Sequence, residues 1–115
     1  MNEKIYDLKQ IEEVCARDSD SFRKIIHTFI NSATDAMAKI QQLAPSGDWA
    51  AIASIAHQLI SGFGYVGAKP LQELAREIEK DAQDRHLTDI KEKTNRLLNN
   101  GTLLINVLKA DLKMS

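Results

Sequence analysis

The sequence predicts an all-α fold, an antiparallel up-down four-helix bundle with a short extra helix at the N-terminus. Two Pro and five Gly among 115 residues leave long stretches without helix breakers. Four of these stretches repeat apolar residues at the i, i+3, i+4, i+7 spacing of a helix that faces a core, and none alternates as a strand does. Because the connectors are short, neighbouring helices are expected to pack antiparallel. The length fits a single domain over residues 1–115.

The short extra helix is predicted from Leu8, Ile11 and Cys15, which repeat at helical spacing. Asp7 is its expected N-cap, because a carboxylate can accept hydrogen bonds from the free N–H groups at a helix start. Ile11 and Val14 are expected on its inner face. We expect this helix to lie across one end of the bundle.

The second helix is expected to be long, with Ser19 or Asp20 as its N-cap. It ends where Pro45 and Gly47 interrupt the helical pattern. Its apolar positions form one stripe, made of Phe22, Ile25, Ile26, Phe29, Ile30, Ala33, Met37, Ile40 and Leu43.

The third helix is expected to begin at about Trp49, with Asp48 as its N-cap, and to end near Val66. The fourth begins near Ala68, where Pro70 suits the first turn of a helix. The inward positions are Ile52, Ile55, Ala56, Leu59 and Phe63 in the third helix, and Leu71, Leu74, Ala75, Ile78 and Ala82 in the fourth.

A fifth helix follows a short polar connector, with Thr88 as its predicted N-cap. Gly101 lies within it and is expected to weaken it by about 1 kcal/mol relative to Ala. Its apolar positions are Ile90, Leu97, Leu98, Leu104, Ile105, Leu108 and Leu112.

The charge pattern argues against two classes of partner. Fifteen basic and 16 acidic side chains give a formal net charge of −1, and no long run of one sign occurs. Nucleic acid and anionic membranes are therefore not expected partners. Cys15, the single cysteine, cannot form an intrachain disulfide. With no secretory leader and no apolar run near 18 residues, we expect a cytoplasmic protein, and we expect it to be a monomer.

His57 is the candidate functional residue of the third helix. Helical geometry places it about 130° from the centre of the apolar stripe, so it is expected at the rim or in solvent. A neutral imidazole is a nucleophile near neutral pH, and here a partner surface could approach it closely. Its neighbours three, four and seven residues away lack long charged side chains: Ala53, Ser54, Ile60, Ser61 and Gly64. His27 has an ordinary solvated face around it, and His86 falls in a connector.

The segment AHQLISGFGYVGAKPLQELAREIE, residues 56–79, resembles the signature of histidine-containing phosphotransfer (HPt) domains. The resemblance extends more loosely to both ends, through YDLKQIEEV, DSDSF and GDWAAIASIAH, and so covers nearly the whole chain. The matching positions are Ala56, His57, Leu59, Gly67, Ala68, Leu71, Leu74 and Glu79.

This resemblance implies that His57 relays a phosphoryl group between the aspartates of response-regulator receiver domains. Receiver domains are then the expected partners, together with a hybrid histidine kinase. The chain would be a phosphocarrier and not an independent enzyme. It would need no cofactor of its own, with Mg²⁺ expected on the receiver. Ala53, Ser54, Ile60 and Gly64 are the expected docking surface.

Two positions depart from the family pattern. The family commonly has Lys three residues after the histidine and Gly four residues after it, where this chain has Ile60 and Ser61. Ser61 is still small, but Ile60 supplies neither charge nor a hydrogen bond to a phosphoryl group. Gln58 and Lys69 are the candidates to compensate, so Gln58, Ser61 and Lys69 are the predicted neighbours of the phosphoryl site.

Other functions are less well supported. Ile60 favours an alternative in which the chain is a degenerate HPt adapter that binds a receiver or kinase without transfer. A small-molecule enzyme lacks an acid–base partner for His57. No metal site is predicted, because one Cys and three His without ligand spacing fit neither zinc nor a di-iron bundle.

Overall fold

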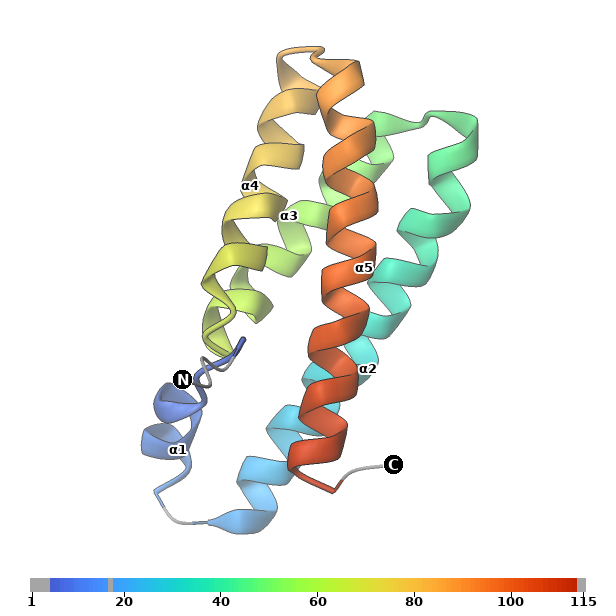
Figure 1. Cartoon of the computed structure of the whole chain (residues 1–115). Coiled ribbons are helices and arrows are strands. Elements are labelled where there is room, and N and C mark those ends of the chain that lie inside the picture. The colour runs from blue at the N-terminus through green and yellow to red at the C-terminus, as the bar shows by residue number, and fades with distance from the viewer. Residues whose placement is uncertain (1–4, 17, 114–115) are drawn as a thin grey trace.

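The structure, a computed structural model, describes residues 5–16 and 18–113. These residues form five α-helices and no strand: α1 (Lys9–Cys15), α2 (Ser19–Leu43), α3 (Trp49–Tyr65), α4 (Lys69–Gln83) and α5 (Leu87–Asp111). A 3-10 turn, η1 (Ala44–Ser46), follows α2. Figure 1 shows α2 to α5 running alternately up and down beside one another. The predicted all-α four-helix bundle with a short N-terminal helix is confirmed.

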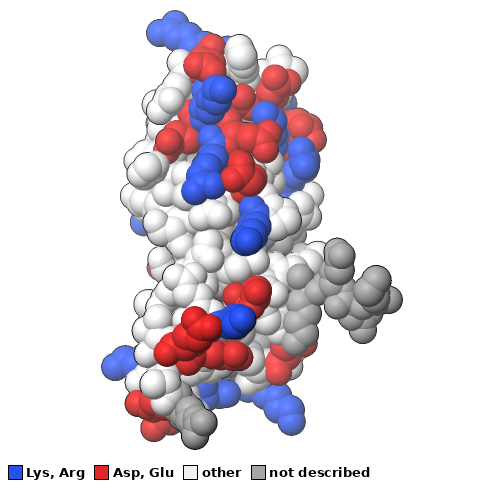
Figure 2. All heavy atoms as spheres, turned by 90° about the vertical axis from the view of Figure 1, so that its left-hand side faces the viewer, with Lys and Arg blue, Asp and Glu red and all other residues white. Residues whose placement is uncertain are grey.

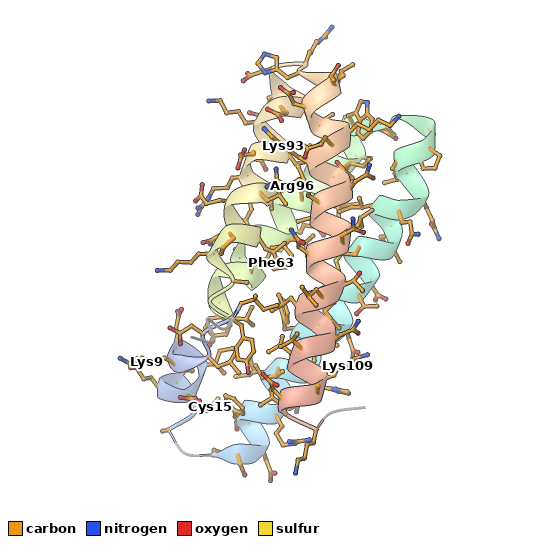
Figure 3. The ribbon with its side chains drawn as sticks, viewed as in Figure 1. Lys9, Cys15, Phe63, Lys93, Arg96 and Lys109 are labelled. Atoms are coloured by element: carbon orange, nitrogen blue, oxygen red, sulfur yellow. The ribbon has the colours of Figure 1, made fainter. Side chains whose placement is uncertain are left out.

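The apolar stripes of all five helices meet in one core. Ile26, Ile40, Ile52, Ile78 and Leu97 are fully buried there, and each belongs to a stripe expected from its spacing. Figure 3 shows Phe63 between the helices, where its ring packs edge-on against Phe29 at 6.2 Å between centroids. The apolar patterning of the sequence is therefore sufficient to orient each helix.

Helices α2 and α5 extend beyond α3 and α4 at one end of the bundle, and α1 covers this overhang (Figure 1). α2 and α5 have 25 residues each, whereas α3 has 17 and α4 has 15. At about 1.5 Å per residue, α2 and α5 are longer by roughly 12–15 Å. α1 lies beside this overhang, below the ends of α3 and α4 (Figure 1). Ile11 and Cys15 are buried, as expected for its inner face, but Val14 is 63% exposed and its predicted burial is wrong.

The segment before α1 is held against the connection between α3 and α4. The Asp7 N–H donates to the Val66 carbonyl at 2.8 Å, and the Tyr6 hydroxyl donates to the Asp111 carboxylate at 2.6 Å. Gly67 has a φ of +69°, and a Cβ on it would overlap the Asp7 backbone. Glycine is therefore required at position 67 both for its conformation and for this close approach.

Three predicted N-caps are wrong, and two of them are those of α2 and α5. Asp18, not Ser19 or Asp20, caps α2, because its carboxylate accepts from the Asp20 and Ser21 N–H groups. Thr88 is not the cap of α5: it lies inside the first turn, since the helix begins at Leu87.

The other ends agree with the sequence. Asp48 caps α3 by accepting from Ala51, and α3 ends next to Val66. α4 begins directly after Ala68, with Pro70 in its first turn. The start of α1 differs: Leu8, not the predicted Asp7, is its N-cap, although the Asp7 carboxylate accepts from the Lys9 N–H.

One buried ion pair fastens α4 to α5. Asp81 is 7% exposed, and the Lys93 ammonium donates to its carboxylate at 2.8 Å and lies 3.2 Å from Glu77. Figure 3 shows Lys93 in the space between the two helices. Gly101 of α5 is also a packing position, because a Cβ there would overlap the Met37 sulfur. The predicted weak point in α5 therefore allows α2 and α5 to approach.

Candidate functional site

His57 lies in the middle of α3, on the side of that helix that faces solvent and α4. Ile52, Ala56, Leu59 and Phe63 of the same helix are buried, which fixes the rotation of α3 about its axis. The imidazole is therefore turned outward, and 69% of the side chain is exposed. The expected exposure of His57 is confirmed.

A carboxylate from the next helix contacts the imidazole. Glu79 Oε2 lies 2.5 Å from His57 Nδ1, and the Glu79 side chain is only 28% exposed. A carboxylate can only accept a hydrogen bond, so the contact places a proton on Nδ1, and in the neutral ring Nε2 then carries the lone pair. Among the residues that the structure describes, Nε2 has no hydrogen-bond partner. In the neutral form, the pair thus leaves Nε2 as the one nitrogen with a free lone pair.

The close packing of α3 and α4 places Glu79 at the same level along the bundle as His57. The Gln72 amide donates to the Ile60 carbonyl at 3.1 Å. Gly64 makes room for the same amide, because a Cβ at Gly64 would overlap Gln72 Nε2. Gly64, predicted as part of a docking surface, is therefore also the glycine that lets Gln72 tie α4 to α3.

The other predicted site residues are not equally accessible. Ser54, Gln58 and Ser61 are exposed, whereas Ile60 is half-buried against the core and Ala53 is buried at 9% exposure. Ala53 thus offers little surface to a partner.

Lys69 lies far from the imidazole. It is the first residue of α4, ten residues before Glu79, and so about 15 Å away along the helix. It is therefore too distant to replace a lysine beside His57.

Sequence reasoning did not assign a role to Glu79. Its match to the HPt signature, 22 residues after His57, was the available signal. The motif does not show that Glu79 contacts His57, because this contact depends on how α3 and α4 are aligned.

The face of the molecule on the α4 side is mixed in charge (Figure 1 and Figure 2). Figure 2 shows acidic and basic side chains crowded together toward the end of the bundle where α4 meets α5, with neutral surface across the middle. Neither sign dominates this face. A partner docking on this face would therefore meet both signs of charge and neutral surface (Figure 2).

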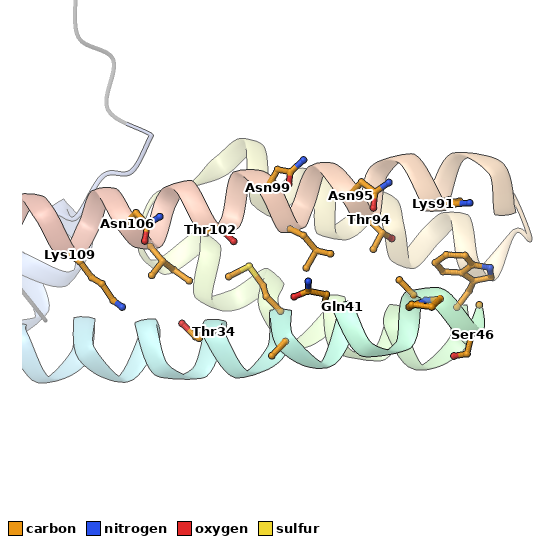
Figure 4. A pocket seen from close by; sticks show the side chains of 18 residues that line it. Thr34, Gln41, Ser46, Lys91, Thr94, Asn95, Asn99, Thr102, Asn106 and Lys109 are labelled. Carbon is orange, nitrogen blue, oxygen red and sulfur yellow. The ribbon is translucent and has the colours of Figure 1, made fainter.

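A large hollow lies elsewhere. It is an open groove of about 1060 Å³ between α2 and α5, away from His57, with Met37 and Ile105 among its apolar lining. Figure 4 shows the amides and hydroxyls along it, including Gln41, Asn95 and Asn99. The described residues that line the groove include no His, Cys, Asp or Glu, so it holds no histidine comparable to His57.

Two further findings concern metals and membranes. Residues 5–16 and 18–113 contain no group of three or more His, Cys, Asp or Glu side chains placed to hold a metal ion. Within the same ranges, no helix has the length and apolar character needed to cross a bilayer.

Fold and site together define a helical-bundle protein in which, among the described residues, one exposed histidine is paired with a carboxylate. The family model described as Hpt domain matches residues 24–108, about three quarters of the chain. The chain belongs to the Hpt domain family. Searches of curated proteins and of solved structures gave no match. Membership gives the chain a role in phosphotransfer relays, in which Hpt domains interact with receiver domains.

Proposed function

We propose that His57 accepts a phosphoryl group from the phospho-aspartate of one receiver domain and passes it to the aspartate of another. The observation that carries this proposal is the contact between His57 Nδ1 and Glu79 Oε2. In the neutral ring it leaves the lone pair on Nε2, and the side chain is exposed on a helix whose opposite face is buried. A side chain placed in this way can attack phosphorus without any rearrangement of the bundle.

In the proposed step, the lone pair of Nε2 attacks the phosphorus atom in line with the bond to the aspartyl oxygen. The new N–P bond forms as that P–O bond breaks, and its electron pair leaves on the aspartate carboxylate. The ring becomes positively charged while Nδ1 keeps its proton. The Glu79 carboxylate lies next to this charge and stabilises it. Reversal of the same step returns the phosphoryl group to an aspartate.

The receiver is expected to supply the rest of the chemistry. Its acidic pocket and its Mg²⁺ would neutralise charge on the transferring group, while this chain supplies the nucleophile and the docking face. The chain then acts as a carrier and not as an independent catalyst. We expect receiver domains to dock over α3, where Ser54, Ser61 and the exposed edge of Ile60 surround the imidazole.

A second function is supported by one specific observation. Ile60 brings no cation to the position where the family commonly has lysine, which favours an adapter that binds a receiver or kinase without accepting phosphate. The pairing of His57 with Glu79 favours transfer over this alternative.

A transfer assay separates the two functions. The protein is incubated with receiver domains from the same organism that carry radioactive aspartyl phosphate, and label on the chain is tested for acid lability and stability to alkali. We expect label on the parent protein and none on His57→Gln. His27→Gln is the matched control, because His27 is also an exposed helical histidine and should leave labelling unchanged. Binding without label would establish the adapter.

A further inference from the structure

We infer that Arg76 of α4 binds the phosphoryl oxygens on His57 and so supplies the cation that Ile60 cannot. This inference rests on the proposed function of His57. It assigns to the opposite helix a role that the sequence pattern places on α3. A guanidinium is well suited to it, because its N–H groups can pair with two phosphoryl oxygens at once.

The alignment of α3 and α4 places Arg76 at the same level along the bundle as Ile60. His57 contacts Glu79, and Gly64 lies against Gln72. Seven residues separate the two contact positions on each helix, so the antiparallel alignment is constant across this interval. Ile60, three residues after His57, is therefore level with Arg76, three residues before Glu79. Arg76 therefore lies on α4 opposite Ile60, the position where the family commonly has lysine.

The distance is within reach of an arginine. Arg76 is about 4.5 Å along α4 from Glu79 and about 60° around it, on the side turned to solvent. Glu79 already reaches Nδ1 from its own position, and an arginine side chain is two atoms longer than a glutamate. The His57 and Arg76 side chains are 69% and 51% exposed, so both lie on the solvent side of their helices.

Arg76 is held only weakly in the free protein. Its guanidinium lies 2.7 Å from the Glu73 carboxylate, but the two side chains are 51% and 64% exposed. An exposed pair of this kind contributes little to stability, so little opposes its exchange for a doubly charged phosphoryl group. Glu73 then returns to solvent.

The neighbouring lysines of α4 are placed less well. Lys69 is about 15 Å along α4 from Glu79. Lys80 follows Glu79 directly and is therefore turned about 100° around the helix from it. Lys93 is engaged by Asp81 and Glu77 on the α5 side of α4. Of the cations on or against α4 that the structure describes, Arg76 best meets three conditions. It is level with Ile60, it lies within about 60° of Glu79 around the helix, and it is held only by an exposed ion pair.

The test measures how long phosphate stays on His57. The intact protein is phosphorylated with phosphoramidate, excess reagent is removed, and the phosphohistidine signal is followed by ³¹P NMR. We expect Arg76→Ala to shorten the half-life about tenfold, which corresponds to ~1.4 kcal/mol. Arg96→Ala is the matched control, because Arg96 is also an exposed helical arginine, 56% exposed and paired with Glu92 at 3.7 Å. It should leave the half-life unchanged.

A rescue variant makes the inference specific. Ile60→Lys in the Arg76→Ala background restores a cation at the same height and should return the half-life toward that of the parent. An unchanged half-life in Arg76→Ala would overturn the role of Arg76 while leaving His57 as the phosphoacceptor. Absence of phosphohistidine on the parent protein would instead refute the proposed function itself. Circular dichroism on each variant separates either outcome from loss of the fold.

Discussion

The contact between Glu79 and His57 predicts how fast phosphate is accepted. Glu79→Gln keeps the size of the side chain and removes its negative charge. During attack by Nε2 the ring gains positive charge, and a carboxylate oxygen 2.5 Å from Nδ1 stabilises this charge more than it stabilises the neutral ring. The variant should therefore bind receivers normally and accept phosphate more slowly.

The exposure of the pair sets the size of the effect. Two unit charges about 4 Å apart interact by about 4 kcal/mol at an effective dielectric constant of about 20. Because the His57 side chain is 69% exposed, solvent screening reduces this value. We expect the barrier to rise by about 1–2 kcal/mol, which slows transfer roughly 5- to 30-fold.

Rapid-quench measurement of single-turnover transfer from a phosphorylated receiver provides the assay. Glu92→Gln is the matched control, since Glu92 is an exposed glutamate on α5, 65% exposed and paired with Arg96. Equal transfer rates for Glu79→Gln and Glu92→Gln would refute the reasoning, because the carboxylate would then contribute nothing to the reacting ring.

Three further predictions concern the fold that holds the site, each measured by urea unfolding. Lys93→Met leaves Asp81 buried without its cation and should lower the free energy of unfolding by ~2 kcal/mol, while Lys91→Met, at an exposed position of the same helix, should change it by less than ~0.5 kcal/mol. Gly67→Ala should lower the free energy of unfolding by ~2–4 kcal/mol, because the added Cβ would overlap Asp7 and the alanine would have to adopt a left-handed backbone conformation. Gly47→Ala, with a φ of +71° but open space around it, should lose only ~1–2 kcal/mol, and equal losses would contradict the packing argument. Burial, together with the hydrogen bond to Asp111 and its charge, raises the pKa of Tyr6 from 10.0 to about 12. A raised folded pKa contributes stability below pH 10 that is lost as the pH rises toward 12, so Tyr6→Phe should lose less stability over that window than the parent does.

The helices could be predicted because periodicity alone determines which side of each is buried. The stripes of α2 to α5 are long enough that one face is clearly more apolar than the others. Val14 was misplaced because α1 has only seven residues, too few to distinguish two adjacent faces. The cap of α2 was missed because Asp18, Ser19 and Asp20 are all good N-caps, and only the backbone selects one of them.

The site could be predicted only in part. The position of His57 follows from the geometry of one helix, so its exposure could be derived from spacing. Its pairing with Glu79 could not, since it depends on the alignment of two helices. The small residue at Gly64 illustrates the same limit. From one helix it indicates an open surface, whereas across the helix pair it is the space that Gln72 fills.

The most direct test of the account is the identity of the phosphorylated atom. Protein labelled with ¹⁵N in histidine is phosphorylated by a receiver, and the imidazole nitrogens are examined by NMR for coupling to ³¹P. Since Glu79 holds Nδ1, we expect a single phosphorylated nitrogen, Nε2 of His57, with Nδ1 still protonated. Phosphate on Nδ1, or on His27 or His86, would contradict the account.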